Sequence, residues 1–484
     1  MLSMRAALYF MSFKIVRRLR PCLLCALSVL GLGGGLPPAA ADMTSPAATT
    51  GGVAQAAQDP QQTSSWSTHG GLSQFYRINA SGGGGQDSEI DTDVDLTTQF
   101  IGDDYRLQGH LIGGYVGGPV DSGFDDPLHI SSLYLDAAAS DGRSEARLRR
   151  QAPEGGGVLG PFDGLFLSRQ IEPGLRLNLV GGFPMDNSAK VITGTRLYGV
   201  NADLGTVGKG WDFNTFAIEQ FSGHLLDRRA VGGQARYSGP QGSVMGLVDY
   251  DVSYRTLNLL LLTGNLHLPD HTEIDVTYNQ RKGPILTTSN ALIGQADSSL
   301  TALSQHYTED QIRQLARDRS ADSRSFTIGA VHPISERLQV GGDITSSSVS
   351  ATPASGGVAA TAADDADWSY GLHLMGKDLL KHGDGALVDL HHETHLGCDN
   401  WSLNLDTRYP ISRTWYVNPV VHLERQHVSG ESGNWWSLMP TLRINHLVRL
   451  NLNLEVEVGG QWRRGGGAST SPGYYLSVGY QMNF

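Results

Sequence analysis

Carboxylates occupy every second position in several stretches of the chain. Successive side chains of a strand point to opposite faces, so carboxylates with this spacing share one face and their apolar alternates the other. Around the first group, Ile90, Val94, Leu96 and Phe100 fill the alternate positions. One face would then be wet and acidic, able to enrich cations or sugars over anions. The residues predicted to line it are Asp91, Asp93, Asp95, Glu273, Asp275, Glu455 and Glu457.

A second group combines imidazoles with a carboxylate. His391, Glu393 and His395 lie at alternate positions and would share a face of one strand. Imidazole and carboxylate suit a transition metal. Their spacing along a strand, about 6 to 7 Å, would require further ligands from other strands or from water. His422 and Glu424 are candidates for such ligands. The alternative is an ordinary polar wall, and the sequence leaves both readings open.

The sequence offers little support for a catalytic or nucleotide-binding site. No G-x-S-x-G elbow occurs, and Asp399 beside Cys398 is the wrong neighbour for lowering a thiol pKa. Gly155, Gly157 and Gly160 have the form G-x-G-x-x-G, but an alternating strand pattern follows where a phosphate site needs a helix. The net charge of −12 disfavours nucleic acid as a partner. We therefore predict no cofactor and no enzyme activity, with an outer-membrane enzyme as an alternative.

The chain divides into three parts by composition. Residues 1–41 have a basic start, an apolar stretch and Ala39-Ala40-Ala41, which together predict a secretory signal peptide. Residues 42–65 are rich in small and polar residues and predict a disordered periplasmic leader. Residues 66–484 carry the alternating pattern, and no stretch there approaches the roughly 18 apolar residues of a membrane helix.

The alternating segments predict an all-β fold, a single transmembrane antiparallel up-and-down β-barrel of about 22 strands (range 16–22). A soluble sandwich also alternates. Connection lengths favour the barrel, because short turns such as 102–104 and 171–174 regularly follow even-numbered strands. Longer connections such as 184–194, 282–323 and 350–367 follow odd-numbered ones. This asymmetry is typical of outer-membrane barrels.

The longest predicted loop contains a helix. Thr308–Gln311 has the form of a capping box, and Ile312, Leu315 and Ala316 follow on one helical face. The helix either folds into the mouth and constricts it, or lies outside as a solvated cover. The residues that would face solutes in the first case are Arg313, Arg317 and Arg319.

Aromatic residues indicate where the strands meet the membrane surfaces. The eight tryptophans fall near predicted strand ends, as interfacial girdles require: Trp66, Trp211, Trp368, Trp401, Trp415, Trp435, Trp436 and Trp462. The last strand ends on an aromatic residue. It resembles the C-terminal signal that the barrel-assembly machinery recognises in bacterial outer-membrane proteins, and the matching residues are Val478, Tyr480, Met482 and Phe484.

Short motifs narrow the resemblance. The turns Pro333–Arg337 and Pro410–Arg413, together with Gly156–Gly164 and Thr308–Arg324, resemble the C-terminal barrels of exopolysaccharide-export porins. Those proteins carry tetratricopeptide repeats before the barrel, and no repeat helices are evident here. The resemblance implies polysaccharide as a solute and coupling, if any, through a separate periplasmic protein.

The expectation is therefore a channel in the cell outer membrane, for passive diffusion or export of polar solutes. Its other partners would be membrane lipid and the barrel-assembly machinery. A structural or adhesive barrel with binding loops is the alternative. A TonB-dependent transporter also has about 22 strands, but it needs an N-terminal plug that residues 42–65 are too short to form.

Overall fold

The computed structural model describes residues 64–82, 85–118, 127–152, 157–186, 190–395, 397–429, 433–465, 468–469 and 472–484. The predicted signal peptide lies outside these residues. So does the predicted leader, except for Ser64 and Ser65, where the first strand begins.

The first half of the described chain forms twelve strands in sequence order. They are β1 (Ser65–Ser81), β2 (Gln86–Ile101), β3 (Tyr105–Gly117), β4 (Leu128–Ala139), β5 (Ser144–Gln151), β6 (Phe162–Glu172), β7 (Leu175–Pro184), β8 (Thr195–Val207), β9 (Trp211–Ser222), β10 (Leu225–Gly239), β11 (Gly242–Asp251) and β12 (Thr256–His267).

The second half contains the helices and the remaining strands. In order these are β13 (Glu273–Gly283), η1 (Thr288–Leu292), α3 (Leu300–Leu303), α4 (Glu309–Asp318), β14 (Ala321–Ser335), β15 (Leu338–Val349), β16 (Asp364–Lys377), β17 (Gly385–His395), β18 (Cys398–Pro410), β19 (Trp415–Val428), β20 (Asn434–Arg449), β21 (Leu452–Gly465), β22 (Ala468–Ser469) and β23 (Gly473–Asn483).

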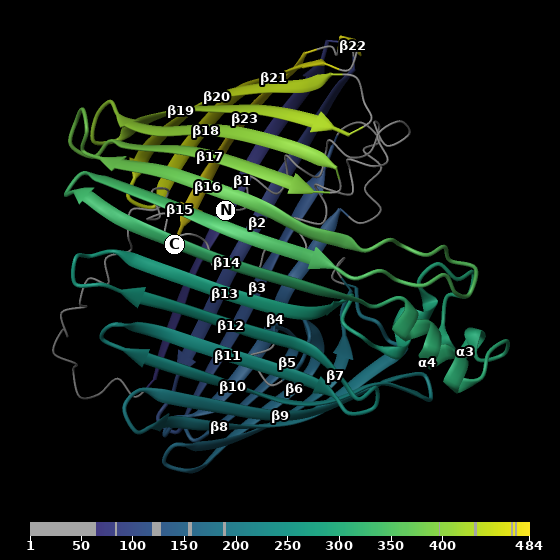
Figure 1. Ribbon diagram of the computed structural model, residues 1–484. Helices are drawn as coiled ribbons and strands as arrows, with labels where there is room; N and C mark the ends of the chain where they lie inside the picture. The colour runs from purple at the N-terminus through teal and green to yellow at the C-terminus, as the bar shows by residue number, and fades with distance from the viewer. Residues whose placement is uncertain are drawn as a thin grey trace.

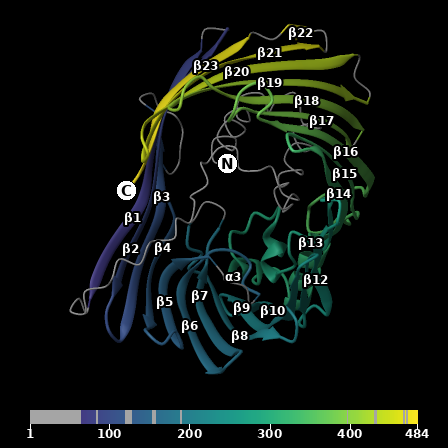
Figure 2. The same ribbon diagram turned by 90° about the vertical axis from the view of Figure 1, so that its left-hand side faces the viewer.

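Each strand pairs antiparallel with the next, and the ring closes on itself. β21 pairs with β23, and β23 pairs with β1 from Gly71↔Asn483 to Ser81↔Gly473. β22 adds only a two-residue ladder beside β21. The wall is therefore a closed 22-strand antiparallel barrel, seen along its length in Figure 1 and end-on in Figure 2. This confirms the predicted outer-membrane-type architecture and its strand number.

The two ends of the barrel differ in their connections, as predicted. Turns after even-numbered strands are short, for example 173–174, 240–241 and 450–451. The longest connections, 284–320 and 350–363, follow odd-numbered strands and gather at the opposite end (Figure 1). The predicted helix is α4, with the capping box between Thr308 and Gln311 formed. None of the helices in the described residues is long and apolar enough to cross a membrane.

The strands have two chemically different faces. On β21, Leu454, Val456 and Val458 are 41–49% exposed, whereas Glu457 between them is only 8% exposed. Exposed leucine, valine and aromatic residues recur at alternate positions around the ring. Such an apolar outer surface would be costly in water but is what a hydrocarbon environment requires. Tryptophans such as Trp211, Trp415 and Trp462 lie near strand ends and are exposed, as the girdle hypothesis predicts.

Candidate functional site: the inner wall and the mouth of the barrel

The three alternating aspartates of β2 lie on the face opposite the apolar row. Asp95 Oδ1 is 4.0 Å from His110 Nδ1 on β3, and the same His110 nitrogen bonds Thr97 at 2.9 Å. The Asp93 carboxylate lies against the small Gly114 of β3. Arg77 and His129 are the basic side chains that act electrostatically on Asp91. Acidic groups outnumber these basic side chains, because buried Glu89 also stands opposite Arg77.

Glu455 and Glu457 lie on the inner face as well, but they share a cation. Arg443 on β20 donates through Nε to Glu457 Oε2 at 2.7 Å and lies 3.5 Å from Glu455. The Tyr475 hydroxyl on β23 donates to Glu457 Oε1 at 2.8 Å. Sequence reasoning treated both glutamates as free wall charges. One arginine faces two glutamates, so Arg443 offsets half of the charge of this pair.

Glu273 and Asp275 on β13 face inward and pair with the neighbouring strand β12. His267 Nδ1 lies 3.5 Å from Glu273, and Asn265 donates to Asp275 at 2.8 Å. Thus all seven predicted wall residues lie on one face of the sheet, distributed over three separate parts of the ring.

A further polar stretch runs across β15 to β19. His373 on β16 lies between Asp343 on β15, at 3.2 Å, and Asp389 on β17, at 3.1 Å. On β17, His391 is 3.6 Å from Glu393, and on β19 His422 bonds Asn404 of β18. Sequence reasoning found His391 and Glu393 of β17 and His422 of β19, but not Asp343, His373 or Asp389. They are contributed one per strand, so only the register brings them together.

The predicted metal-binding set is corrected by this register. His391 and Glu393 approach each other, but His395 turns to Asp364 and Asp367 of β16. The donor atoms of His391 and Glu393 could meet, but His395 is engaged by the adjacent end of β16, so the three predicted residues do not converge on one point. Among the described residues, the one group of three metal-ligating side chains with mutually close donor atoms is Asp364, Asp367 and His395.

The long β13–β14 connection, residues 284–320, packs on the end of the wall through its own small core. Leu300, Leu303 and Ile312 are buried against Leu225 of β10 and Tyr254 of the β11–β12 turn. The Tyr254 hydroxyl bonds Thr288 at 2.8 Å. Burial raises the pKa of Tyr254, which keeps this hydroxyl neutral. The helices stand at the long-loop end in Figure 1 and within the outline of the ring in Figure 2.

The three arginines of this loop differ in their surroundings. Arg313 donates to the Ser253 carbonyl at 2.6 Å and lies over the Tyr254 ring. Arg317 is exposed, 5.3 Å from the same ring centre. Arg319 is buried and donates to the carbonyls of Ile293 and Ser355. Arg319 therefore holds two loops together and does not face a solute, contrary to the constriction hypothesis for that residue.

A buried charged cluster lies below the loops, and no sequence signal indicated it. Arg228 of β10 is 1% exposed and donates to Asp249 of β11 and, at 2.8 Å, to the carbonyl of Gly157 in the β5–β6 loop. Asp227 accepts the backbone N–H of Ser289 at 2.6 Å. Two loops are thus attached to the wall through β10. Gly157 and Gly160 both have positive φ, and the strand β6 follows them, in agreement with the loop reading.

The residues of the predicted assembly signal share the outer face of β23. Val478 pairs with Tyr76 and Val456, which are also exposed. Phe484 exchanges two backbone hydrogen bonds with Gly70, of 2.9 and 3.0 Å, and so completes the closing ladder. Tyr480 and Met482 continue the same row.

Comparison with known proteins yields structural neighbours only. No family model matches the chain, and no curated protein matches it. The translocation pore of the P pilus usher PapC has a TM-score of 0.44 at 11% identity, over 85% of this chain and 99% of that one. OccK11 (OpdR) of Pseudomonas aeruginosa has a TM-score of 0.34 at 12% identity, over 87% and 96%. OccK5 (OpdH) of the same organism has a TM-score of 0.37 at 10% identity, over 87% of this chain and 98% of that one. At these identities and TM-scores, the similarity carries no conclusion about function.

Proposed function

We propose that this chain is an outer-membrane channel for polar solutes. The observation that carries the proposal is the two-faced wall: apolar side chains cover the outside of a closed 22-strand ring, and hydrogen-bonding and charged side chains line the inside. A ring of this size encloses more space than wall side chains can fill, so its interior holds water or a plug.

The inner wall supports a polar and cation-favouring path. The aspartates of β2 are incompletely neutralised, and β15 to β19 add imidazole, amide and carboxylate groups. Groups of this kind replace the hydration of polar solutes, and the carboxylates among them repel anions. Hydroxyl-rich solutes, including sugars, match the same donors and acceptors. The resemblance to exopolysaccharide-export porins suggests a more specific form of this function, the export of polysaccharide.

The test is conductance of the folded chain in planar lipid bilayers. Open-channel steps that persist are expected, with blockade by soluble oligosaccharides if sugars occupy the path. Heat-modifiable migration on gels serves as the control for folding. A barrel that is folded by this criterion but electrically silent would overturn the channel function and favour a structural or adhesive barrel.

A further inference from the structure

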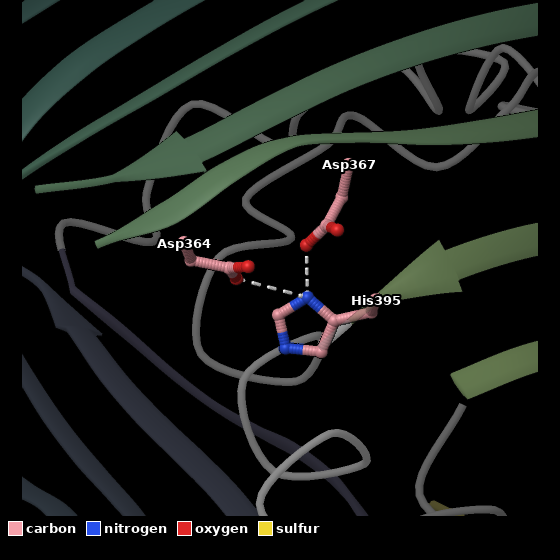
Figure 3. A group of neighbouring side chains, drawn as sticks. All are labelled: Asp364, Asp367 and His395. Carbon is pink, nitrogen blue, oxygen red and sulfur yellow. Dashed lines mark hydrogen bonds and ion pairs between the residues drawn. The ribbon is translucent and has the colours of Figure 1, made fainter. Parts of the chain in front are cut away.

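Asp364, Asp367 and His395 converge at one end of the neighbouring strands β16 and β17. Asp364 is the first residue of β16, and His395 is the last residue of β17. Figure 3 shows both carboxylates directed at Nδ1 of the imidazole. Nδ1 lies 3.2 Å from Asp364 Oδ2 and closer still to Asp367 Oδ2. One donor atom from each residue lies within 4.8 Å of the other two.

The separation of His395 Nδ1 from Asp364 Oδ2 is close to that of two ligands around a small divalent ion. Zinc binds imidazole nitrogen and carboxylate oxygen at about 2.0–2.2 Å, so the ligand atoms of a tetrahedral site lie roughly 3.4 Å apart. The three side chains are 15–17% exposed, which shields them partly from water yet leaves the site reachable. We propose that Asp364, Asp367 and His395 form a binding site for a divalent transition-metal ion of the zinc type, with water at the remaining position.

The donor set distinguishes this ion class from harder cations. Calcium and magnesium prefer all-oxygen sites, and an imidazole nitrogen in a set of three argues against them. Two carboxylates and a neutral imidazole carry a net charge of −2, which a divalent ion balances.

The position of the site gives the ion a structural consequence. The ion would join the two strand ends at the base of the 350–363 loop. That loop is attached in turn to the β13–β14 connection, through Arg319 with Ser355 and through Gln295, which donates to the Gly356 carbonyl at 2.7 Å. Metal binding would therefore brace the covered side of the mouth. The site stands whether or not the barrel conducts.

The test is calorimetric titration of Zn²⁺ into the full chain, folded in detergent and freed of metal by a chelator. One tight site per chain is expected in the unaltered protein. His395→Gln and the double variant Asp364→Asn/Asp367→Asn are each expected to weaken binding at least about tenfold. His391→Gln is the matched control, because it removes another inward imidazole of the same strand, and it should bind as the unaltered protein does.

Three results of the titrations would overturn the proposal. The first is no zinc binding by the unaltered protein, which would leave the three side chains as a hydrogen-bonded group without a metal. The second is an equal loss in His391→Gln, and the third is Ca²⁺ binding as tightly as Zn²⁺. X-ray absorption at the zinc edge gives a readout that needs no variant. It should report only nitrogen and oxygen ligands, at about 2.0–2.2 Å, and sulfur in the first shell would contradict the site.

Discussion

For a single residue of the wall, the face to which its side chain points decides its environment. Leu403 in the middle of β18 is 39% exposed and pairs with Leu390 and Leu423 on the neighbouring strands. Ser402, one residue earlier, pairs with His391 and Glu424 on the other face. Neighbouring positions of a strand therefore face different environments, one the lipid and the next the polar interior.

Leu403→Arg should destabilise the barrel far more than Ser402→Arg. The first variant places a charge in hydrocarbon near the middle of the strand, at about 2–4 kcal/mol. The second places the same charge beside the carboxylate of Glu424. Refolding into lipid bilayers, followed by heat-modifiable migration, measures the difference. Equal losses of folded protein would show that the facing of β18 is misassigned.

A second prediction at this scale concerns Arg319, which joins two loops. Arg319→Ala removes a buried guanidinium, takes its hydrogen bond from the Ile293 carbonyl and takes one of two donors from the Ser355 carbonyl, at a cost on the order of 1–3 kcal/mol. The β13–β14 loop should then be cleaved by protease roughly tenfold faster or more. Arg317→Ala removes an exposed arginine two residues away and should change the rate little. Identical rates in both variants would contradict a fastening role for Arg319.

The same residues show what a sequence can predict at the level of side chains. The alternation of Asp91 with Val94 and of Glu457 with Val458 was sufficient to assign faces, because the period of a strand is fixed by its covalent geometry. The partners were not predictable. Arg443 meets Glu457 only through the register of two strands, and that register depends on how the whole ring closes.

Secondary-structure elements were predicted most completely, because the residues that determine them are close together in the sequence. The capping box of Thr308 and Gln311 and the buried face of α4 are set within a few residues, so α4 was foreseen from sequence. The surface on which this helix packs was not predicted, because Leu225 and Tyr254 contact it from distant parts of the chain. Arg228 escaped notice for the same reason, because its partners Asp249 and Gly157 lie on other elements.

Replacement of residues 289–319 by a short Gly-Ser linker should leave the barrel folded. The ladders of β13 with β14 and of β14 with β15 do not include this loop. A closed sheet is held chiefly by its strand ladders. Leu225 would become exposed at the mouth, which is a local cost. Loss of heat-modifiable migration would show instead that the loop supports the wall.

The same variant tests whether the loop narrows the path. Its single-channel conductance should exceed that of the unaltered protein, because the helices lie within the outline of the ring (Figure 2). An unchanged conductance in a folded variant would place the loop beside the path.

For the whole molecule, closure of the ring turns alternation along each strand into an inside and an outside. The strand number and the difference between the two ends were predictable, since turn lengths and alternation are visible in the sequence. The net charge of the inner wall was not predictable, because it depends on which cationic side chains lie beside each carboxylate. Arg443 offsets one of the two charges on its glutamates through close ion pairs. The β2 aspartates have weaker partners, the nearest being His110, 4.0 Å from Asp95.

The β2 row should therefore control the charge selectivity of a conducting barrel. At physiological salt the Debye length is about 8 Å, so three inward carboxylates raise the cation concentration beside them, and at 1 M salt it falls to about 3 Å and their influence fades. Replacement of all three by Asn should lower cation selectivity, measured as the reversal potential in a salt gradient, and most strongly at low salt. The control makes an equal charge change in exposed turns and should leave that potential almost unaltered: Asp103→Asn, Asp104→Asn and Asp141→Asn. If the inward triple variant conducts with an unchanged reversal potential at low salt, or if the turn variant shifts it equally, the β2 aspartates do not line the path.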